Sequence, residues 1–471
     1  MKTECTQVNG GFQALGKREI VTNFDGGDIT SDGGSLLLRE VEGRIALLKR
    51  FSECFTDYRD PKRIEHDVLS LVSQRVFGLA LGYEDLCDHD ELAKDKMLAI
   101  AVGKQDPTGN SRKSPKDKGK PLAGKSTLNR LELSPSEITA KSYYKKICLD
   151  ENKVDTLFVD IFIESHAVAP KQIILDVDAT DDPLHGNQEG RFFHGYYKAY
   201  CYLPLYIFCG EHLLCARLRT ANNDAAAGTV EELISIVERI RASWPDTEIV
   251  VRGDSGFCRE ELICWCEDHD VDYIFGLAKN NRLKVEIEEE MALARALHQC
   301  SHKAEREYKD FCYCTLKTWR WHRRVIGKAE YLSKGENPRF IVTSFRKDRY
   351  EAQELYEQMY CARGDMENRI DEQQLMLFAA RTSTSKLRSN QIRLYFSSVA
   401  YVIVQALRRL CLSGTKMAKA QCDTIRLKLL KIGARIRITV RKVWVSMATG
   451  YPYKDTWDQI LNQLDTIPLR E

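Results

Sequence analysis

The chain has 471 residues, and its 70 Lys and Arg residues almost balance its 68 Asp and Glu residues, leaving a formal net charge of +2. This balance argues against a nucleic-acid-binding protein, because such domains usually carry a clear basic surplus. A composition of 43% hydrophobic and 29% charged residues excludes a wholly disordered chain, and the length predicts about three domains.

No segment has the character of a membrane span or of a secretory signal. The longest apolar stretch near the C-terminus, 399–404, is much shorter than the roughly 20 residues of a spanning helix. The opening residues, MKTECTQVNGG, lack a basic segment followed by an apolar one. The 16 cysteines are scattered without a C-x-x-C pair, which favours a reducing compartment, so we expect a cytoplasmic protein.

Apolar residues at helical spacing dominate the first part of the chain. A turn-rich segment at 24–34 precedes predicted helices at 35–51, 66–92 and 94–102. The stretch 101–126 is rich in Gly, Pro, Ser and Lys and has seven basic and two acidic residues. This composition predicts a basic loop or linker.

Strand patterns begin near residue 171. They predict three strands, a helix, a strand, a second helix and a further strand, at 171–180, 198–208, 212–220, 228–244, 247–254, 259–270 and 271–279. Residues 305–345 are rich in aromatic and β-branched residues, which predicts a small β unit. A helix interrupted near Gly364 is predicted after residue 348, and the tail beyond 385 is predicted to be mostly helical and basic.

Acidic residues close two of the predicted strands. Asp178 lies at the end of the first strand, with Asp176 two residues earlier and therefore on the same face. Asp254 closes the strand 247–254. This order matches an α/β RNase H-like core, in which the first and fourth strands lie side by side and present their acids at one edge. For each residue alone, a turn or helix-capping role is the simpler account.

A third acid, Glu367, lies in the helix predicted after the β unit. Tyr360, Arg363 and Glu367 recur at i, i+3 and i+7, which places them on one helix face. Asp365 competes for the same role, and a solvated helix position or an ion-pair partner is the alternative for Glu367. Converging carboxylates raise one another's pKa unless cations neutralise them, and oxygen ligands favour Mg²⁺ or Mn²⁺. The predicted metal ligands are Asp178, Asp254, Glu367 and Asp176.

Several separated motifs resemble those of bacterial insertion-sequence transposases with a DDE group 1 domain, within the set that carries the Tyr-Arg-Glu-Lys signature. The matching stretches are LDVDATDDPLHGNQEG (175–190), YCYLPLYIF (200–208), VVRGDSGF (250–257), NPRFIVTSF (337–345) and YCARGDMENRI (360–370). RVFGLALGYEDLCDHDELAKD (75–95) is similar to the helical lead of the family, so the likeness covers most of the chain.

The resemblance assigns roles to single residues. It implies that Asp178, Asp254 and Glu367 are the catalytic acids. It also implies that Tyr360 and Arg363 contact DNA near the cleavage site.

The resemblance also extends to the β unit and to the end of the helix that carries Glu367. The β unit is similar to an insertion in which Trp319 or Trp321 would stack on an exposed base, with a buried core tryptophan as the alternative. Gln374 stands where the family has a lysine that contacts a terminal phosphate.

The patterns and the resemblance together divide the chain into four regions. We predict a helical N-terminal region (1–150), with the basic linker 101–126, that binds DNA ends. The RNase H-like catalytic core is predicted over 165–290 and 350–390, and a β-rich insertion over 291–349. A helical, basic C-terminal region is predicted over 391–471.

The resemblance implies a DNA transposase that cleaves the ends of its own insertion sequence and joins them to target DNA, by two-metal phosphodiester hydrolysis and strand transfer. It further implies a homodimer that pairs two ends in a synaptic complex, next to the bacterial nucleoid. Two alternatives stay open from the residues: an RNase H-like nuclease without strand transfer, and a non-catalytic protein that binds DNA ends.

One motif points to a different chemistry. GKPLAGKS (119–126) satisfies the G-x-x-x-x-G-K-S pattern of phosphate-binding loops. Such a loop follows a buried strand and opens a helix, whereas SRKSPKDK (111–118) precedes this one and cannot form a central strand. We therefore expect no nucleotide partner.

The near-neutral total conceals segregated charge. Residues 406–442 hold eleven basic residues and one acidic residue, and 101–126 is basic as well, so the rest of the chain is acidic. Two basic runs in an acidic chain suit phosphate contacts, although a solvated surface is the alternative. The residues predicted to bind DNA in the second run are Arg408, Arg409, Lys428, Lys431, Arg435 and Arg437.

Overall fold

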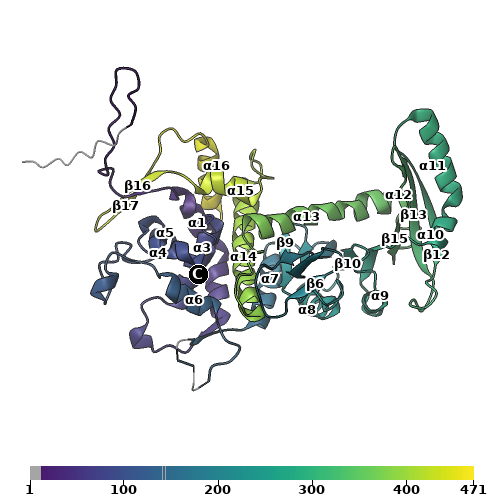
Figure 1. Ribbon diagram of the computed structural model, residues 1–471, viewed down its shortest axis with the longest axis horizontal. Helices are drawn as coiled ribbons and strands as arrows, with labels where there is room; N and C mark the ends of the chain where they lie inside the picture. The colour runs from purple at the N-terminus through teal and green to yellow at the C-terminus, as the bar shows by residue number, and fades with distance from the viewer. Residues whose placement is uncertain (1–11, 140–141, 144, 471) are drawn as a thin grey trace, which may run out of the picture.

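The computed structural model describes residues 12–139, 142–143 and 145–470. Residues 1–11, on which the prediction about a secretory signal rests, lie outside the described residues. The molecule is elongated: a lobe built from both ends of the chain is followed by a central sheet and then by an arm (Figure 1). In the described part of the chain, no helix combines the length and the apolar character needed to cross a membrane.

Short helices make up the early part of the lobe. They are α1 (Leu36–Ile45), α2 (Leu47–Glu53), α3 (Val68–Ala80), α4 (His89–Leu92), α5 (Lys96–Val102) and α6 (Lys125–Glu132), with 3₁₀ turns at Gly33–Ser35, Pro61–Arg63, Leu86–Asp88 and Pro115–Asp117. An aspartate begins α3, because the Asp67 carboxylate accepts a hydrogen bond from the backbone N of Ser70 at 2.7 Å. β2 (Phe55–Asp57) pairs with β3 (Ile147–Leu149) beside these helices.

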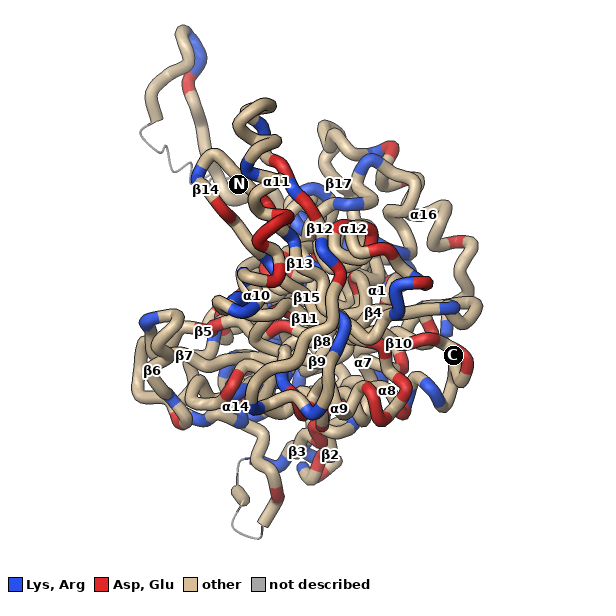
Figure 2. The backbone as a smooth tube through the Cα atoms, turned by 90° about the vertical axis from the view of Figure 1, so that its right-hand side faces the viewer, with Lys and Arg blue, Asp and Glu red and all other residues tan. Residues whose placement is uncertain are grey.

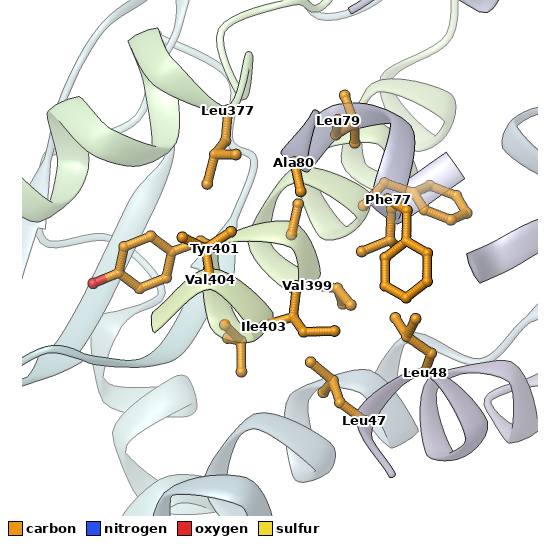
Figure 3. Close-up of a cluster of buried hydrophobic side chains, with 14 of the residues drawn as sticks. Leu47, Leu48, Phe77, Leu79, Ala80, Leu377, Val399, Tyr401, Ile403 and Val404 are labelled. Atoms are coloured by element: carbon orange, nitrogen blue, oxygen red, sulfur yellow. The ribbon is translucent and has the colours of Figure 1, made fainter. Parts of the chain in front are cut away.

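Helix α14 (Leu387–Leu407) comes from late in the chain but forms the core of the lobe. Most of its residues are buried, and it packs against α1, α2 and α3. Figure 3 shows Val399 and Ile403 of α14 near Leu47 and Leu48 of α2, with Phe77 of α3 in the same cluster. Burying each such side chain stabilises the fold by about 1.5–3 kcal/mol. The lobe therefore depends on segments from both ends of the chain.

A mixed sheet has the strand order β12-β13-β15-β11-β10-β4-β8-β9. Its central strands are β4 (Gln172–Ala179), β8 (Leu205–Cys209), β9 (His212–Arg217), β10 (Glu248–Gly253) and β11 (Asp272–Leu277). β4 is parallel to β10 and β10 to β11, whereas β8 and β9 form an antiparallel hairpin that pairs with β4. The runs of Ile, Leu and Val in β4 and β10 suit strands that are covered on both faces.

Helices cover both faces of this sheet. On one face, α7 (Glu151–Glu164), α8 (Thr229–Ser243) and α9 (Glu260–Asp268) share a hydrophobic cluster with the strands. On the other face lies the site helix, as we call the helical segment 352–376, whose Leu355 packs with Val250 and Ile274. Its parts are α12 (Ala352–Glu354), turns at Leu355–Tyr360 and Cys361–Arg363, α13 (Gly364–Asp371) and a turn at Glu372–Met376. Figure 1 shows it running along the sheet toward the arm.

The arm extends the central sheet. β12 (Glu305–Tyr313) and β13 (Arg323–Leu332) form a hairpin, and β15 (Arg339–Thr343) connects it to β11; α10 (Asn281–Glu286), α11 (Glu288–Ser301) and β14 (Gly335–Glu336) complete the arm. α11 packs on β12 and β13. Acidic and basic residues are interspersed along α11 and the strands beside it (Figure 2). The β unit predicted from the sequence is thus continuous with the core sheet.

A second, smaller sheet interrupts the sequence between β4 and β8. Its order is β5 (Asp182–Pro183), β7 (Ala199–Tyr202) and β6 (Phe192–His194). The single strand predicted over 198–208 is wrong, because Leu203 and Pro204 separate β7 from β8. Proline has no N–H to donate to a neighbouring strand, so the chain changes sheet at this point.

The C-terminal region is only partly helical. After α14 it forms helical turns at Arg408–Leu412, Cys422–Ile425 (α15) and Arg426–Leu430, and it ends with α16 (Lys454–Thr466). Between these, β16 (Ala434–Ile438) and β17 (Val443–Met447) form a hairpin, and β1 (Ile29–Thr30) pairs with β16. The prediction of a helical C-terminal region is therefore wrong for 434–447.

Candidate active site

Two acidic residues stand at the carboxyl ends of neighbouring parallel strands. Asp178 is the penultimate residue of β4, and Asp254 directly follows β10. The register pairs Val177 with Gly253, so both acids reach the same edge of the sheet. Both line one pocket of about 650 Å³, which we call the acid pocket.

The third acid reaches this pocket from the site helix. Glu367 and Arg363 lie one helical turn apart, and both line the pocket. The α-helix is interrupted by a 3₁₀ turn at Cys361–Arg363, directly before Gly364, but Gly364 has the helical angles φ −55° and ψ −22°, so the helical path continues. Because the helix continues past Gly364, the spacing of Arg363 and Glu367 is kept on one face.

Arg363 joins two of the acids. Its Nη1 donates to Asp178 Oδ2 and its Nη2 donates to Glu367 Oε1, both at 3.0 Å. Asp178 Oδ1 also accepts from the backbone N of Ala179 at 2.8 Å. The side chains of Asp178 and Arg363 are mostly buried, whereas that of Glu367 is 63% exposed. Asp178 is therefore held firmly, and Glu367 depends mainly on its contact with Arg363.

The three carboxylates influence one another electrostatically. Burial raises the pKa of Asp178 to about 6, although the positive charge of Arg363 lowers it. The negative charges of Asp254 and Glu367 raise it further. Asp254 is fixed by its own loop, since its Oδ1 accepts from the backbone N of Gly256 at 2.8 Å.

The oxygen donors of this pocket suit a hard divalent cation. Carboxylates are the ligands that Mg²⁺ and Mn²⁺ prefer, and a cation beside Asp178 would relieve the repulsion that raises its pKa. Among the residues that the structure describes, no three His, Cys, Asp or Glu side chains are grouped so as to hold an ion. Arg363 instead supplies the positive charge between Asp178 and Glu367.

Asp176, a predicted metal ligand, is paired with an arginine in the structure. Arg252 Nε donates to Asp176 Oδ1 at 2.5 Å, and Arg252 Nη2 donates to Oδ2 at 2.7 Å. Both side chains are 7% exposed, and neither residue lines the acid pocket. The reason is the register of the sheet, which places Asp176 on β4 directly opposite Arg252 on β10.

Three residues predicted to bind DNA have other contacts. Trp319 is 8% exposed and therefore cannot stack on a base from solvent. Arg408 is 2% exposed, and its Nη1 donates to Glu372 Oε1 at 2.8 Å. Lys431 Nζ forms an ion pair with Asp32 Oδ1 at 2.7 Å. Long-range partners thus neutralise the two basic residues, and Trp319 and Arg408 present little surface to DNA in this structure.

The other predicted DNA-binding residues are more accessible. Trp321 is 45% exposed, and Lys428, Arg435 and Arg437 are exposed as well. Arg409 is half-buried. These residues lie on separate parts of the structure, since Trp321 belongs to the arm and the others to the lobe.

Sequence reasoning missed an aromatic rim of the pocket. His194, Tyr196 and Tyr197, from β6 and the turn to β7, line the pocket beside the acids. Tyr197 Oη donates to the backbone O of Ala179 at 3.4 Å, and Tyr196 is 83% exposed. The density of aromatic residues in FFHGYYKAY (192–200) was the available signal.

Tyr360 also approaches the pocket, because a glycine leaves room for it. A Cβ atom on Gly276 of β11 would lie 2.6 Å from Tyr360 Oη and 2.9 Å from the backbone N of Ser255. Only glycine therefore allows the tyrosine hydroxyl to lie against the loop that carries Asp254.

The glycine-rich motif 119–126 has a structural role in this fold. A 3₁₀ turn at Pro115–Asp117 precedes it, and Lys125 begins α6. Asp90 occupies the start of this helix: its Oδ1 accepts from the backbone N of Lys125 at 3.1 Å, and its Oδ2 is 2.9 Å from Lys125 Nζ. A carboxylate thus takes the place that a phosphate would need.

Three acidic residues from separate elements of this α/β fold, Asp178, Asp254 and Glu367, thus line one pocket. The sequence profile described as "Transposase DDE domain group 1" matches residues 12–469. The chain therefore belongs to this transposase family, as the resemblance in its motifs predicted.

The chain is also similar to a solved structure, the cryo-EM structure of a piggyBac transposase synaptic complex with hairpin DNA. The sequence identity is 11%, the TM-score is 0.40, and the match covers 85% of this chain and 80% of that chain. None of the curated proteins matches the chain.

Proposed function

We propose that this transposase cleaves the ends of its own mobile element and joins them to target DNA in an RNase H-like core. Family membership supports an enzyme that cuts and joins DNA. The strand order β9-β8-β4-β10-β11 supports the core, because it places the first of these strands in the chain, β4, beside the fourth, β10.

One observation carries the proposal: Asp178, Asp254 and Glu367 come from a strand, a loop and a helix, yet line one pocket. A cap or turn role accounts for each residue alone but not for their meeting. The three carboxylates would hold divalent cations, either Mg²⁺ or Mn²⁺. Such cations, when bound, activate the attacking oxygen and stabilise the leaving oxygen of a phosphodiester.

The residues around the acids would bind and orient the DNA. Asp178, with a pKa of about 6, is mostly ionised at neutral pH and can act as a ligand. Arg363 has a planar guanidinium group that suits a phosphate, so DNA would replace one of its carboxylate partners. Tyr360 lies against the loop of Asp254 and would contact the DNA beside the cleaved bond.

A strand-transfer assay tests the proposal directly. The parent protein should join pre-cleaved element ends to a target plasmid in Mg²⁺ or Mn²⁺. Asp254→Asn should lower both cleavage and joining by more than about 100-fold while duplex binding stays intact. A protein that cleaves but never joins would be an RNase H-like nuclease, and one that binds ends without cleaving them would be a binding protein. Either result contradicts the proposal.

The proposed reaction needs two element ends in one assembly, so we include a homodimer in the proposal. Light scattering with and without end DNA measures the mass of the protein. A protein that joins ends while monomeric on DNA would contradict this part alone.

A further inference from the structure

The hairpin of β16 and β17 projects from the lobe. Its register pairs Arg437 with Trp444 and Ile438 with Val443. Figure 1 shows the two strands leaving the lobe beside α16, on the other side of α14 from the central sheet. β1 pairs with the base of the hairpin, and the outer end has no further strand beside it in the described residues.

The hairpin has two different faces. On β16, Ala434 and Ile436 are buried, whereas Arg435 and Arg437 are exposed. Directly paired residues of antiparallel strands share a face, so Arg437 and Trp444 lie together on the solvent side. This alternation follows the period of two in ARIRI, which fixes the arginines outward because the alanine and isoleucine pack inward.

The exposed face combines positive charge with an aromatic ring. Arg437 Cζ lies 5.4 Å from the centre of the Trp444 ring, and Lys442 Nζ lies 5.5 Å from it. Trp444 is 45% exposed, and Val440, at the tip, is fully exposed. Val440, Val443 and Trp444 thus give the outer end of the hairpin an exposed apolar surface beside its basic residues.

No negative charge compensates this face. Residues 434–447 contain Arg435, Arg437, Arg441 and Lys442 and no acidic residue. None of these four forms an ion pair with any residue that the structure describes, in contrast to Arg408 and Lys431 nearby in sequence. Four of the unpaired basic residues of the second basic run therefore lie together on the hairpin, while Lys416, Lys419 and Lys428 are exposed elsewhere on the lobe.

We propose that the β16–β17 hairpin is a β-ribbon that binds double-helical DNA in its major groove. A two-stranded ribbon fits this groove, which is about 12 Å wide. The arginines and Lys442 would contact phosphates and base edges, and Val440 and Trp444 would contact apolar base and sugar atoms. The inference rests on the proposed function only in requiring that the chain acts on DNA.

The hairpin and the acidic residues proposed to cleave DNA lie on opposite sides of α14 (Figure 1). Because α14 lies between the hairpin and the sheet that carries the acids, the ribbon would bind DNA away from the bond that is cut (Figure 1). Binding can therefore be weakened without altering the acid pocket.

The first experiment removes the charge. We compare the quadruple variant R435Q/R437Q/R441Q/K442Q with the matched control K284Q/K303Q/K334Q/K347Q, whose lysines are exposed and form no ion pair with described residues. The hairpin variant should bind a short duplex at least about 10-fold more weakly, and its log–log salt slope should fall by roughly 2 to 4. The control variant should change both quantities far less. Equal behaviour of the two variants overturns the inference.

The second experiment locates the contact on the hairpin and in the DNA groove. A photoreactive amino acid at position 440 should cross-link to duplex DNA, and Trp444→Ala should weaken duplex binding about 5-fold or more. Dimethyl sulfate should reveal protection of guanine N7, in the major groove, that the quadruple variant loses. Protection of adenine N3 alone, a missing cross-link, or equally tight binding of a single strand or an anionic vesicle would overturn the assignment.

The two proposals fail in different ways. If the hairpin variant binds DNA like the parent while cleavage by the parent depends on Asp254, the ribbon is wrong and the transposase proposal stands. If the parent neither cleaves nor joins DNA but binds duplex through the hairpin, the transposase proposal is wrong and the ribbon stands. Unchanged circular dichroism and melting temperature of each variant show that the fold is intact.

Discussion

Arg363 holds the acid pocket together at the level of single residues. It is mostly buried and donates to both Asp178 and Glu367. We expect Arg363→Ala to slow end cleavage by about 100-fold or more, because the carboxylates lose their counter-charge and the DNA loses a phosphate contact. Arg363→Lys keeps the positive charge but lacks the planar guanidinium group, so its cleavage rate should lie between those of Arg363→Ala and the parent. Single-turnover cleavage measures both, and a parent-like rate for Arg363→Ala would contradict the assignment.

Gly276 controls the position of Tyr360. The Cβ of Gly276→Ala would lie 2.6 Å from the tyrosine hydroxyl, so the substitution should destabilise the fold by about 1–3 kcal/mol. Tyr360→Phe removes the obstructing atom, and the double variant should regain part of that stability. Urea unfolding of the parent and the three variants provides the comparison. If the changes in the free energy of unfolding of the two single variants simply add in the double variant, the two residues are not in contact.

Asp182 gives the protein a dependence on pH. It is 1% exposed, its Oδ1 has no partner among the described residues, and burial raises its pKa to about 8. The unfolded chain loses this proton near pH 4. The folded chain keeps the proton up to about pH 8, so the group destabilises the fold progressively as pH rises between these values.

Asp182→Asn removes this titration. The variant should be more stable than the parent at pH 8, by on the order of 2 kcal/mol, and the difference should vanish near pH 4. Urea unfolding at several pH values measures the slope. A parent whose stability does not fall over this range would show that Asp182 is ionised in the fold.

At the level of elements, the ion pair between Asp176 and Arg252 links β4 to β10. Asp176→Ala leaves a buried guanidinium unpaired and should cost about 3–5 kcal/mol. The double variant Asp176→Leu/Arg252→Met replaces the pair by apolar side chains and should be much less destabilised. Because Asp176 does not line the pocket, the double variant should keep cation-dependent cleavage. Loss of cleavage in a stable double variant would restore Asp176 as a ligand.

The elements that carry the acids were predictable from local patterns. The apolar runs of β4 and β10 end in Asp178 and Asp254, and the i, i+4 spacing of Arg363 and Glu367 needs only a continuous helix. The β16–β17 hairpin had a signal too, since ARIRITVRKVWV alternates and is rich in β-branched residues. The density of basic residues drew the interpretation toward a charged helix instead.

Contacts between distant segments could not be predicted. The charge of Arg408 is neutralised by Glu372 of the site helix, and that of Lys431 by Asp32 near the start of the chain. Neither partner is visible in a local window, so both residues were assigned to DNA. The burial of Trp319 could not be predicted for the same reason, because it depends on how the arm packs.

At the level of the whole molecule, the lobe is shared between the two ends of the chain. A fragment ending at residue 150 lacks α14 and would expose Leu48 and Phe77, which α14 helps to bury. We expect this fragment to show no cooperative unfolding by circular dichroism. Adding the segment from 387 to the C-terminus should restore a transition, and a cooperative fragment on its own would contradict this account.

The pairing of β1 with β16 has a consequence for synthesis. Ile29 leaves the ribosome long before its strand partner Arg435 is synthesised. Arg44 likewise waits for the backbone O of Leu464, to which its Nε donates at 3.0 Å. A message that ends early can therefore encode all three acids and still produce no closed lobe. Only a message that continues past the codons for Arg435 and Leu464 yields the closed lobe.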